Sequence, residues 1–348
     1  MIANYIVDFV FDPESDQARE NLCQQILEQK PTHVFLNTAW EAYTFNPCML
    51  SVDEFLFNHG ITTTWVISVC SAHNPIWRQK LKCHVVFLDF MRWRVYNEII
   101  VKKTNSINLK WNPNADRYLF LTGKPHKEQR IRLLYKLHSQ NLMGKCDHSF
   151  FMSPGMYENC KKLLPELTAQ EFADFVQRYQ HNLDNIEPDM QETSMHYGGI
   201  PYDSKIYANS RFRLVSESSM WLRPPFISEK TYLTIVNNNP FVIAGDYMSC
   251  DYLRTYGFET FDKLFDIPSY DLVRPHEQRL SSVIEHVKQW LAGNFNKTEV
   301  ADMVEHNQNR FNELGVITKE KFKLDTGVDI DLAVYSRDSN HVAKSKGW

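Results

Sequence analysis

Short apolar runs alternate with segments of helical periodicity through the first hundred residues of the chain. The runs have the length and composition of buried strands, and the segments between them place apolar residues three and four positions apart. The predicted strands are 5–11, 33–37, 63–70 and 84–89, and the predicted helices are 15–28, 51–58, 75–82 and 92–102. Four strand–helix repeats predict a parallel sheet with helices on both faces, and hence an α/β fold.

A second alternating stretch, residues 211–261, contains a helix start with ionisable residues around it. Ser228 is a good N-cap residue, and Glu229, Lys230 and Thr231 form the first turn of the helix. A phosphate is favoured at such a start because the amide donors are unpaired and the helix dipole is positive there, and Lys230 adds a full charge. Glu229 is expected to point the other way and to accept hydrogen bonds from ribose hydroxyls. This arrangement suits a nucleoside diphosphate.

The residues after this helix continue the alternation. Pro240 stops the helix, residues 241–244 form a short predicted strand, and a further helix at about 248–256 ends at Gly257. Strand, helix, strand and helix in this order make half of a nucleotide-binding α/β domain.

A basic turn precedes this region. Residues 118–137 read as a strand, a Gly-Lys-Pro-His turn and an amphipathic helix. The carboxyl end of a parallel strand is where α/β folds bind ligands, so Lys124, His126 and Arg130 are candidate phosphate-binding residues. A solvated basic helix face remains the alternative for each of them. The turn lacks the GxxxxGK[ST] pattern and is no P-loop.

Residues 117–271 resemble the donor-binding half of the α1,3-fucosyltransferase-like glycosyltransferases and their phage and bacterial relatives. The resemblance is carried by Glu217 after a strand, the Ser-Glu-Lys helix start at 228–230, an apolar Pro-Phe strand ending in Gly, and the Gly-Phe-x-Thr-Phe sequence at 257–261. It implies two Rossmann-like domains facing a cleft, called GT-B, and an inverting reaction. It also implies that Glu229 holds the donor ribose, Lys230 the diphosphate, and that Glu217 lies near the nucleotide. Ser216 and Ser218 flank Glu217 where fucosyltransferases more often show Glu-Asn, so the sugar stays open.

The first domain is expected to supply a general base for the acceptor hydroxyl. Glu41 follows the second predicted strand between two aromatic residues and is the first candidate, with Asp8 and Asp89 as rivals. An acid in such a domain is more often structural. Aromatic residues of this domain could stack on a sugar or a nucleobase or simply fill the core: Trp40, Tyr43, Trp65, Trp77 and Trp93.

The predicted organisation is an acceptor-side domain at 1–112, a nucleotide-sugar donor domain at 113–318 and a polar tail at 319–348, with Pro113 as the linker candidate. Helices are expected at 276–292 and 297–314. In the predicted reaction an acid of the first domain deprotonates the acceptor, while Lys230, the helix start at Ser228 and the turn at Lys124 neutralise the departing diphosphate. Neither a cofactor nor a metal ion is required by this scheme.

Composition limits the other possibilities. Seven scattered cysteines without CxxC spacing argue for a reducing compartment, and no histidine pattern predicts a metal site. The N-terminus lacks a basic leader, and no apolar run approaches the length of about 20 residues that spans a bilayer. The expected location is the cytoplasm, or the host cytoplasm for a viral protein.

The acceptor is left open between several classes. A net charge of −4 excludes a uniformly basic nucleic-acid binder. Phage relatives nevertheless make duplex DNA with a hydroxymethylated, flipped-out base one option. Arg92, Trp93 and Arg94, with Lys102 and Lys103, could contact its phosphates, although an ordinary surface helix is the simpler interpretation. A glycan, a lipid-linked sugar or a protein are other acceptors, and a nucleotide-binding module without catalysis is the alternative function.

Overall fold

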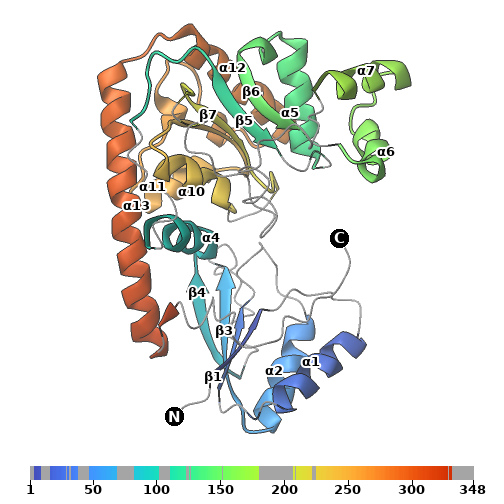
Figure 1. The fold of residues 1–348 in the computed structure, drawn as a ribbon, viewed down its shortest axis with the longest axis vertical. Helices are drawn as coiled ribbons and strands as arrows, with labels where there is room; N and C mark the ends of the chain where they lie inside the picture. The colour runs from blue at the N-terminus through green and yellow to red at the C-terminus, as the bar shows by residue number, and fades with distance from the viewer. Residues whose placement is uncertain are drawn as a thin grey trace. The chain divides into compact units, whose positions relative to one another are not determined.

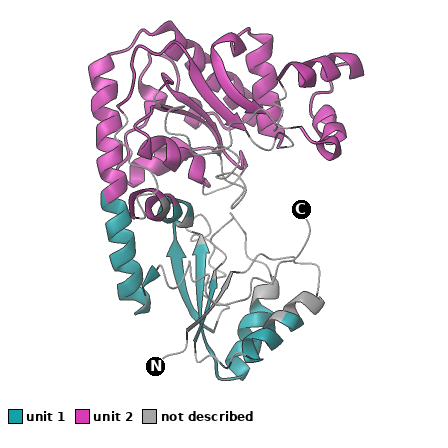
Figure 2. Ribbon diagram, viewed as in Figure 1, with its two compact units in different colours: residues 1–94, 313–348 teal, residues 95–312 magenta. Residues whose placement is uncertain are grey.

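The structure is a computed structural model of the 348-residue chain, and two compact units divide it (Figure 2). Residues Met1–Arg94 and Glu313–Trp348 form the first unit, and Val95–Asn312 form the second. The structure describes residues 4–8, 16–28, 30, 33–37, 47–68, 82–101, 110–122, 125, 127–150, 152–179, 207, 209–221, 225–327 and 329–330.

The first unit contains a four-stranded parallel sheet in the order β1-β2-β3-β4 (Figure 1). Its strands are β1 Asn4–Asp8, β2 His33–Asn37, β3 Thr62–Ser68 and β4 His84–Leu88. The helices between and after them are α1 Asp16–Glu28, α2 Pro47–Asn58 and α4 Phe90–Val95, which the π-helix Tyr96–Val101 continues into the second unit. The predicted strands and the parallel sheet are confirmed, whereas the helix predicted at 75–82 lies almost wholly outside the described residues.

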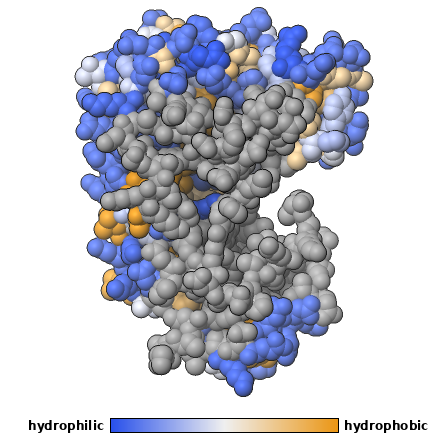
Figure 3. All heavy atoms as spheres, in the orientation of Figure 1, coloured by the Kyte–Doolittle hydropathy of each residue, from blue (hydrophilic) through white to orange (hydrophobic). Residues whose placement is uncertain are grey.

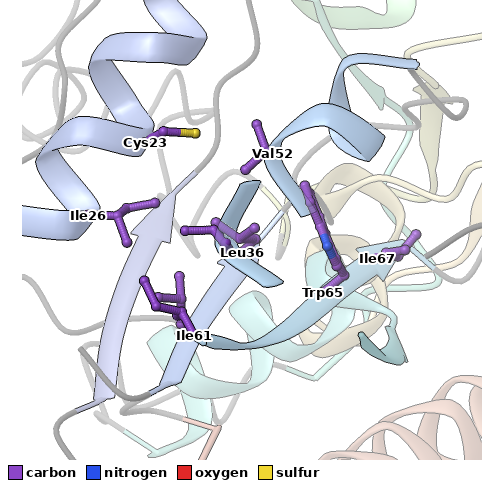
Figure 4. Close-up of a cluster of buried hydrophobic side chains, with 9 residues drawn as sticks. Cys23, Ile26, Leu36, Val52, Ile61, Trp65 and Ile67 are labelled. Atoms are coloured by element: carbon purple, nitrogen blue, oxygen red, sulfur yellow. The ribbon is translucent and has the colours of Figure 1, made fainter. Parts of the chain in front are cut away.

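Helices α1 and α2 pack against each other and therefore share one face of this sheet. Right-handed crossovers in one direction place α1 and α2 on the same side of the sheet. The core on that face contains Cys23 and Ile26 of α1, Leu36 of β2 and Trp65 of β3 (Figure 4). Phe35 and Val66, which point to the opposite face, are also 0% exposed, so both faces of the sheet are covered.

Trp65 and Trp93 are both 0% exposed, so neither can stack on a sugar or a nucleobase. The indole Nε1 of Trp65 instead donates to Oδ1 of buried Asp53, at 3.2 Å. Two of the five aromatic candidates of this domain thus belong to its interior. The other three, Trp40, Tyr43 and Trp77, lie outside the described residues.

The second unit contains another four-stranded parallel sheet, in the order β6-β5-β7-β8. Its strands are β5 Tyr118–Thr122, β6 Cys146–Phe150, β7 Arg213–Ser216 and β8 Phe241–Ala244. Its helices include α5 Glu128–Ser139, α6 Pro154–Lys162, α7 Ala169–Tyr179, α10 Glu229–Val236, α11 Ser249–Thr255 and α12 His276–Ala292. Short 3-10 turns lie at Met143–Lys145, Phe261–Lys263 and Tyr270–Leu272. The protein is therefore a mixed α/β protein with two parallel sheets.

The strand order of this second sheet reverses. The chain runs outward from β5 to β6, returns past β5 to β7 and continues to β8. Helix α5 packs against α12, and α10 packs against β7 and β8. Right-handed crossovers in opposite directions place α5 and α10 on opposite faces, which is the doubly wound arrangement.

The segment before β5 packs within the second unit. The indole Nε1 of Trp111 donates to the backbone oxygen of Arg211 at 2.7 Å, and Nζ of Lys297 donates to Oδ1 of Asn114 at 2.8 Å. Pro113, the linker candidate from the sequence, therefore lies inside the second unit, and the two compact units divide at Arg94.

The last helix, α13 Lys297–Thr326, is longer than predicted. The sequence suggested an end at Leu314, before Gly315, but the helix continues through this glycine. It ends instead at Gly327, whose φ of +73° is the left-handed conformation typical of a helix C-terminus and whose N–H donates to the backbone oxygen of Lys323 at 2.8 Å. Residues 319–326 are therefore helix and not tail.

No helix among the described residues is both long enough and apolar enough to cross a lipid bilayer. The described surface visible in Figure 3 is mostly hydrophilic, with small apolar areas.

Candidate functional site

The carboxyl ends of β5 and β7 form the place where the second sheet changes direction. Open parallel sheets bind ligands in the crevice at such a reversal, because the loops that follow the two strands turn to opposite faces. The four described strands of the first sheet follow one another in chain order and offer no such point. The candidate site is therefore built from the residues that follow β5 and β7.

Glu217 comes directly after β7 and is 0% exposed. Its carboxylate oxygens accept the backbone N–H of Ser228 at 3.2 Å each, and Oε1 accepts the Thr231 hydroxyl at 2.6 Å. Its Cγ also lies 3.2 Å from the position that a Cβ on Gly245 would occupy, so a side chain there would crowd it. Glu217 thus fixes the start of α10 against the end of β7.

The predicted N-cap of α10 is confirmed. Ser228 has extended backbone angles, and its side chain accepts the N–H of Lys230 at 3.3 Å. The hydroxyl of Thr231 is bound to Glu217, so Thr231 holds the helix start.

Lys230 and Glu229 form an ion pair, with 2.7 Å between Nζ and Oε1. The expectation that Glu229 points away from Lys230 is therefore wrong, because the lysine folds back over the first turn and meets the carboxylate of its neighbour. The two side chains are only 10% and 18% exposed. A lysine ammonium has three protons, so Nζ can donate to Glu229 and to an anion at the same time.

Helix α5 brings a second buried cation to this edge. Arg130 is 5% exposed, and burial lowers the pKa of its guanidinium, while the charges of Glu229 and Glu217 oppose that shift. The neighbouring Gln129 donates from Nε2 to the backbone oxygen of Glu217 at 2.9 Å. Gln129 thus joins the start of α5 to the end of β7. No signal in the sequence indicated this role of Gln129.

Two buried hydroxyl groups lie at the ends of the central strands. Thr122 ends β5 and Ser216 ends β7, and each residue is 1% exposed. Extending the register of Leu119 with Arg213 by three residues places them side by side on one face of the sheet. Neither Thr122 Oγ1 nor Ser216 Oγ makes a hydrogen bond in the part of the chain that the structure describes. Sequence reasoning missed both, since a threonine and a serine at strand ends carry no distinctive signal.

The remaining donor-side candidates, Lys124 and His126, lie outside the described residues. The structure therefore brings together six of the predicted donor-side residues: Glu217, Ser228, Glu229, Lys230, Thr231 and Arg130. It adds three residues that were not predicted, which are Gln129, Thr122 and Ser216.

The candidate bases of the first unit lie on different strands. Asp8 is the last residue of β1, and Asp89 directly follows β4. Three strand spacings separate these edges, about 14 Å, so the two acids cannot act as one pair. Asp89 is buried and accepts the N–H of Arg92 at 3.1 Å, which caps the first turn of α4. Glu41 lies outside the described residues.

Arg92 and Trp93 are buried, so the option that they contact DNA phosphates is wrong for both, and so is the simpler interpretation that they lie on a surface helix face. Arg92 Nη2 donates to the hydroxyl of Thr318 at 3.2 Å, and Trp93 is 0% exposed. These two residues hold α4 within the first unit. Lys102 and Lys103 lie outside the described residues.

Two groups of potential metal ligands occur in the described parts of the second unit, and protein donors already contact their carboxylates. Glu277 of the group Glu128, His276 and Glu277 lies 3.3 Å from Arg132. In the other group, Cys250, Asp262 and Asp271, three side-chain donors contact Asp262 and two backbone N–H groups contact Asp271. These carboxylates act as structural acceptors.

A pH dependence of stability is expected from Glu217. Burial raises the pKa of its carboxyl group above the ordinary value of 4.5, although Lys230 and two hydrogen bonds oppose the shift. The folded protein keeps this proton to a higher pH than the unfolded chain, so the contribution of Glu217 to the free energy of unfolding falls as pH rises from 4.5 toward the raised pKa. Urea unfolding of wild type and Glu217→Gln should be measured across this pH range. As the pH rises, the free energy of unfolding of the wild type should fall relative to that of the variant. A difference that does not change with pH would contradict the prediction.

Comparison with known proteins adds no further constraint on this site. No protein-family model matches the chain, and a search of curated proteins found no match.

Proposed function

We propose that this chain is a glycosyltransferase that moves a sugar from a nucleotide-diphosphate donor to an acceptor hydroxyl. One observation carries the proposal: two nearly buried cations, Lys230 and Arg130, both interact electrostatically with Glu217 at the reversal point of a doubly wound parallel sheet, next to a helix start. Buried cations at such a point suit a ligand with several negative charges. The diphosphate is assigned to Lys230 and Arg130, with Thr122 and Ser216 as further hydroxyl partners.

The chemistry required of this site is stabilisation of a leaving group. When the bond from the anomeric carbon to the diphosphate breaks, negative charge develops on the departing phosphate oxygen, and fixed cations lower the energy of that state. The acceptor oxygen attacks from the opposite side after losing its proton to a base, which inverts the anomeric centre. Glu41, Asp8 and Asp89 are the proposed bases, and a GT-B arrangement of the two units would bring such a base to the donor.

Glu229 has a double role in this proposal. Its carboxylate pairs with Lys230 and holds the ammonium at the helix start. A carboxylate has about four acceptor positions, so the same group can also accept ribose hydroxyls. The resemblance to fucosyltransferases assigns it that second role.

The proposed acceptor is a hydroxymethylated base in duplex DNA, which suits a bacteriophage enzyme acting in the cytoplasm of its host, with a glycan as the other acceptor. Since Arg92 and Trp93 are buried, any phosphate contact of the first unit must come from other residues. Neutralising phosphates releases counterions, so binding to DNA should weaken steeply with salt.

The test is a thermal-shift panel of nucleoside diphosphates and nucleotide sugars on the wild-type protein. We expect one base to give a clear rise in Tm, because a ligand that binds only the folded state stabilises it by about 2.7 kcal/mol at one hundred times its Kd. Incubation of the matching nucleotide sugar with glycan and hydroxymethylated DNA acceptors would then show transfer. No shift with any nucleotide would refute the proposal, and a shift without transfer or donor hydrolysis would favour a nucleotide-binding module.

A further inference from the structure

A single buried arginine joins three loops at the carboxyl edge of the second sheet. Arg279 of α12 is 1% exposed. Its Nη2 donates to the backbone oxygen of Met220 at 2.7 Å, its Nε to that of Gly245 at 3.0 Å, and its Nη1 to those of Val273 and Arg274 at 2.6 and 3.0 Å. The loops after β7 and β8 and the loop before α12 are thereby fixed to one another.

These three loops and the first residue of α12 carry aromatic and cationic side chains. Trp221 is 58% exposed, and its ring centroid lies 4.1 Å from that of His276. The Arg274 guanidinium lies 5.4 Å from the centroid of the Tyr247 ring. We call these four residues the aromatic rim. A tryptophan left mostly exposed while its loop is anchored presents a flat face to a ligand, since stacking needs a ring that is held in place.

One backbone position beside the rim has an unusual conformation. Met248, the residue after Tyr247, has φ of +66°, which is costly for a residue other than glycine, and its N–H donates to the backbone oxygen of Asp271 at 3.0 Å. The N–H of Trp221 donates to Ser219 Oγ at 3.1 Å. Conformations of this kind persist only where the surroundings fix them, and they are concentrated at binding sites.

The rim adjoins the proposed diphosphate site. Trp221 follows Glu217 by four residues, so their Cα atoms are at most about 14 Å apart. Arg279 also binds the oxygen of Gly245, a residue in contact with Glu217, and Glu217 in turn binds the start of α10. The residue that fixes the start of α10 thus lies within about 14 Å of Trp221, a separation that one nucleotide can cover.

From this juxtaposition we infer that the aromatic rim binds the nucleobase of the nucleotide, with the base stacked on Trp221. This inference rests on the proposed function and adds to it the residue that holds the base. A base has an apolar face and no charge, which suits an exposed indole, whereas the diphosphate requires the cations at α10.

The experiment compares two ligands on matched variants. Isothermal titration measures the Kd of the nucleoside diphosphate and of inorganic pyrophosphate for wild type, Trp221→Ala, Trp221→Phe and Leu272→Ala. Trp221→Ala should weaken the nucleoside diphosphate about 10-fold and leave pyrophosphate unchanged, because only the former has a base to stack. Trp221→Phe should restore most of the affinity. Leu272, which is 53% exposed on the loop before α12, is the control for loss of an exposed apolar side chain.

Each outcome separates this inference from the proposed function. If Trp221→Ala binds the nucleoside diphosphate as wild type does, or weakens pyrophosphate equally, the rim does not hold the base, although the diphosphate site stands. If the variant binds the nucleotide normally but loses affinity for the acceptor, the rim belongs to the acceptor and the inference is wrong. If wild type binds neither ligand, the proposed function itself fails.

Discussion

Replacing Lys230 with alanine is expected to weaken binding of the nucleoside diphosphate about 10- to 100-fold and to slow sugar transfer about 100- to 1,000-fold. Two effects add. The variant loses a charged hydrogen bond to the phosphates, and it leaves the carboxylate of Glu229 without the ammonium that lies 2.7 Å away, next to an incoming anion. The larger effect on the rate arises because the leaving phosphate is more negative in the transition state than in the bound donor. Titration calorimetry gives the first quantity and product formation at saturating donor gives the second.

Two variants make this result specific. Lys230→Arg keeps the positive charge and should retain more binding than Lys230→Ala, although the planar guanidinium does not reproduce the geometry of the ammonium. Lys263→Ala removes an exposed lysine from the 3-10 turn Phe261–Lys263 of the same unit and should behave as wild type. Equal binding and equal rates for Lys230→Ala and wild type would show that the anion does not bind at α10.

Replacing Arg279 with methionine should lower the free energy of unfolding of the second unit by about 3–5 kcal/mol. Methionine preserves much of the apolar volume but removes four hydrogen bonds, so the backbone oxygens of three loops lose their donor inside the protein. Urea unfolding followed by tryptophan fluorescence measures the change. The same variant should bind the nucleoside diphosphate more weakly, because the loop that carries Trp221 is no longer anchored through Met220.

Helix α12 itself supplies the control. Lys288 has a side chain that is 40% exposed and pairs with Glu285 on the helix surface, so Lys288→Met should change the free energy of unfolding by less than about 0.5 kcal/mol. Arg279→Lys should fall between the two, since an ammonium keeps the charge but cannot reach all three loops at once. A loss below about 1 kcal/mol for Arg279→Met would mean that the loops are fixed by other contacts.

The strands of the first sheet, and β5, β7 and β8 of the second, could be predicted from local sequence pattern, whereas β6, which reads Cys-Asp-His-Ser-Phe, has no apolar run and could not. The runs before residue 90 match β1 to β4 because a strand buried in a parallel sheet needs consecutive apolar residues, and that requirement is visible along the chain. The start of α10 could also be predicted, because Ser228 caps it through a hydrogen bond within three residues. The end of α13 was not, since Gly315 gives the same signal whether it stops a helix or is tolerated inside one.

The sequence by itself determined the α/β class, the parallel strands and a capped helix start with Glu229 and Lys230 in its first turn, all of which depend on neighbours within a few residues. Only the tertiary structure decided that β5 and β7 are adjacent, that Glu217 binds the start of α10, that Arg130 is buried near the charges of Glu217 and Glu229, and that Arg92 and Trp93 are buried. It also decided that Arg279 joins loops that are up to 59 residues distant along the chain. These features depend on strand order and on side-chain packing between distant segments, and neither leaves a periodic trace in one sequence.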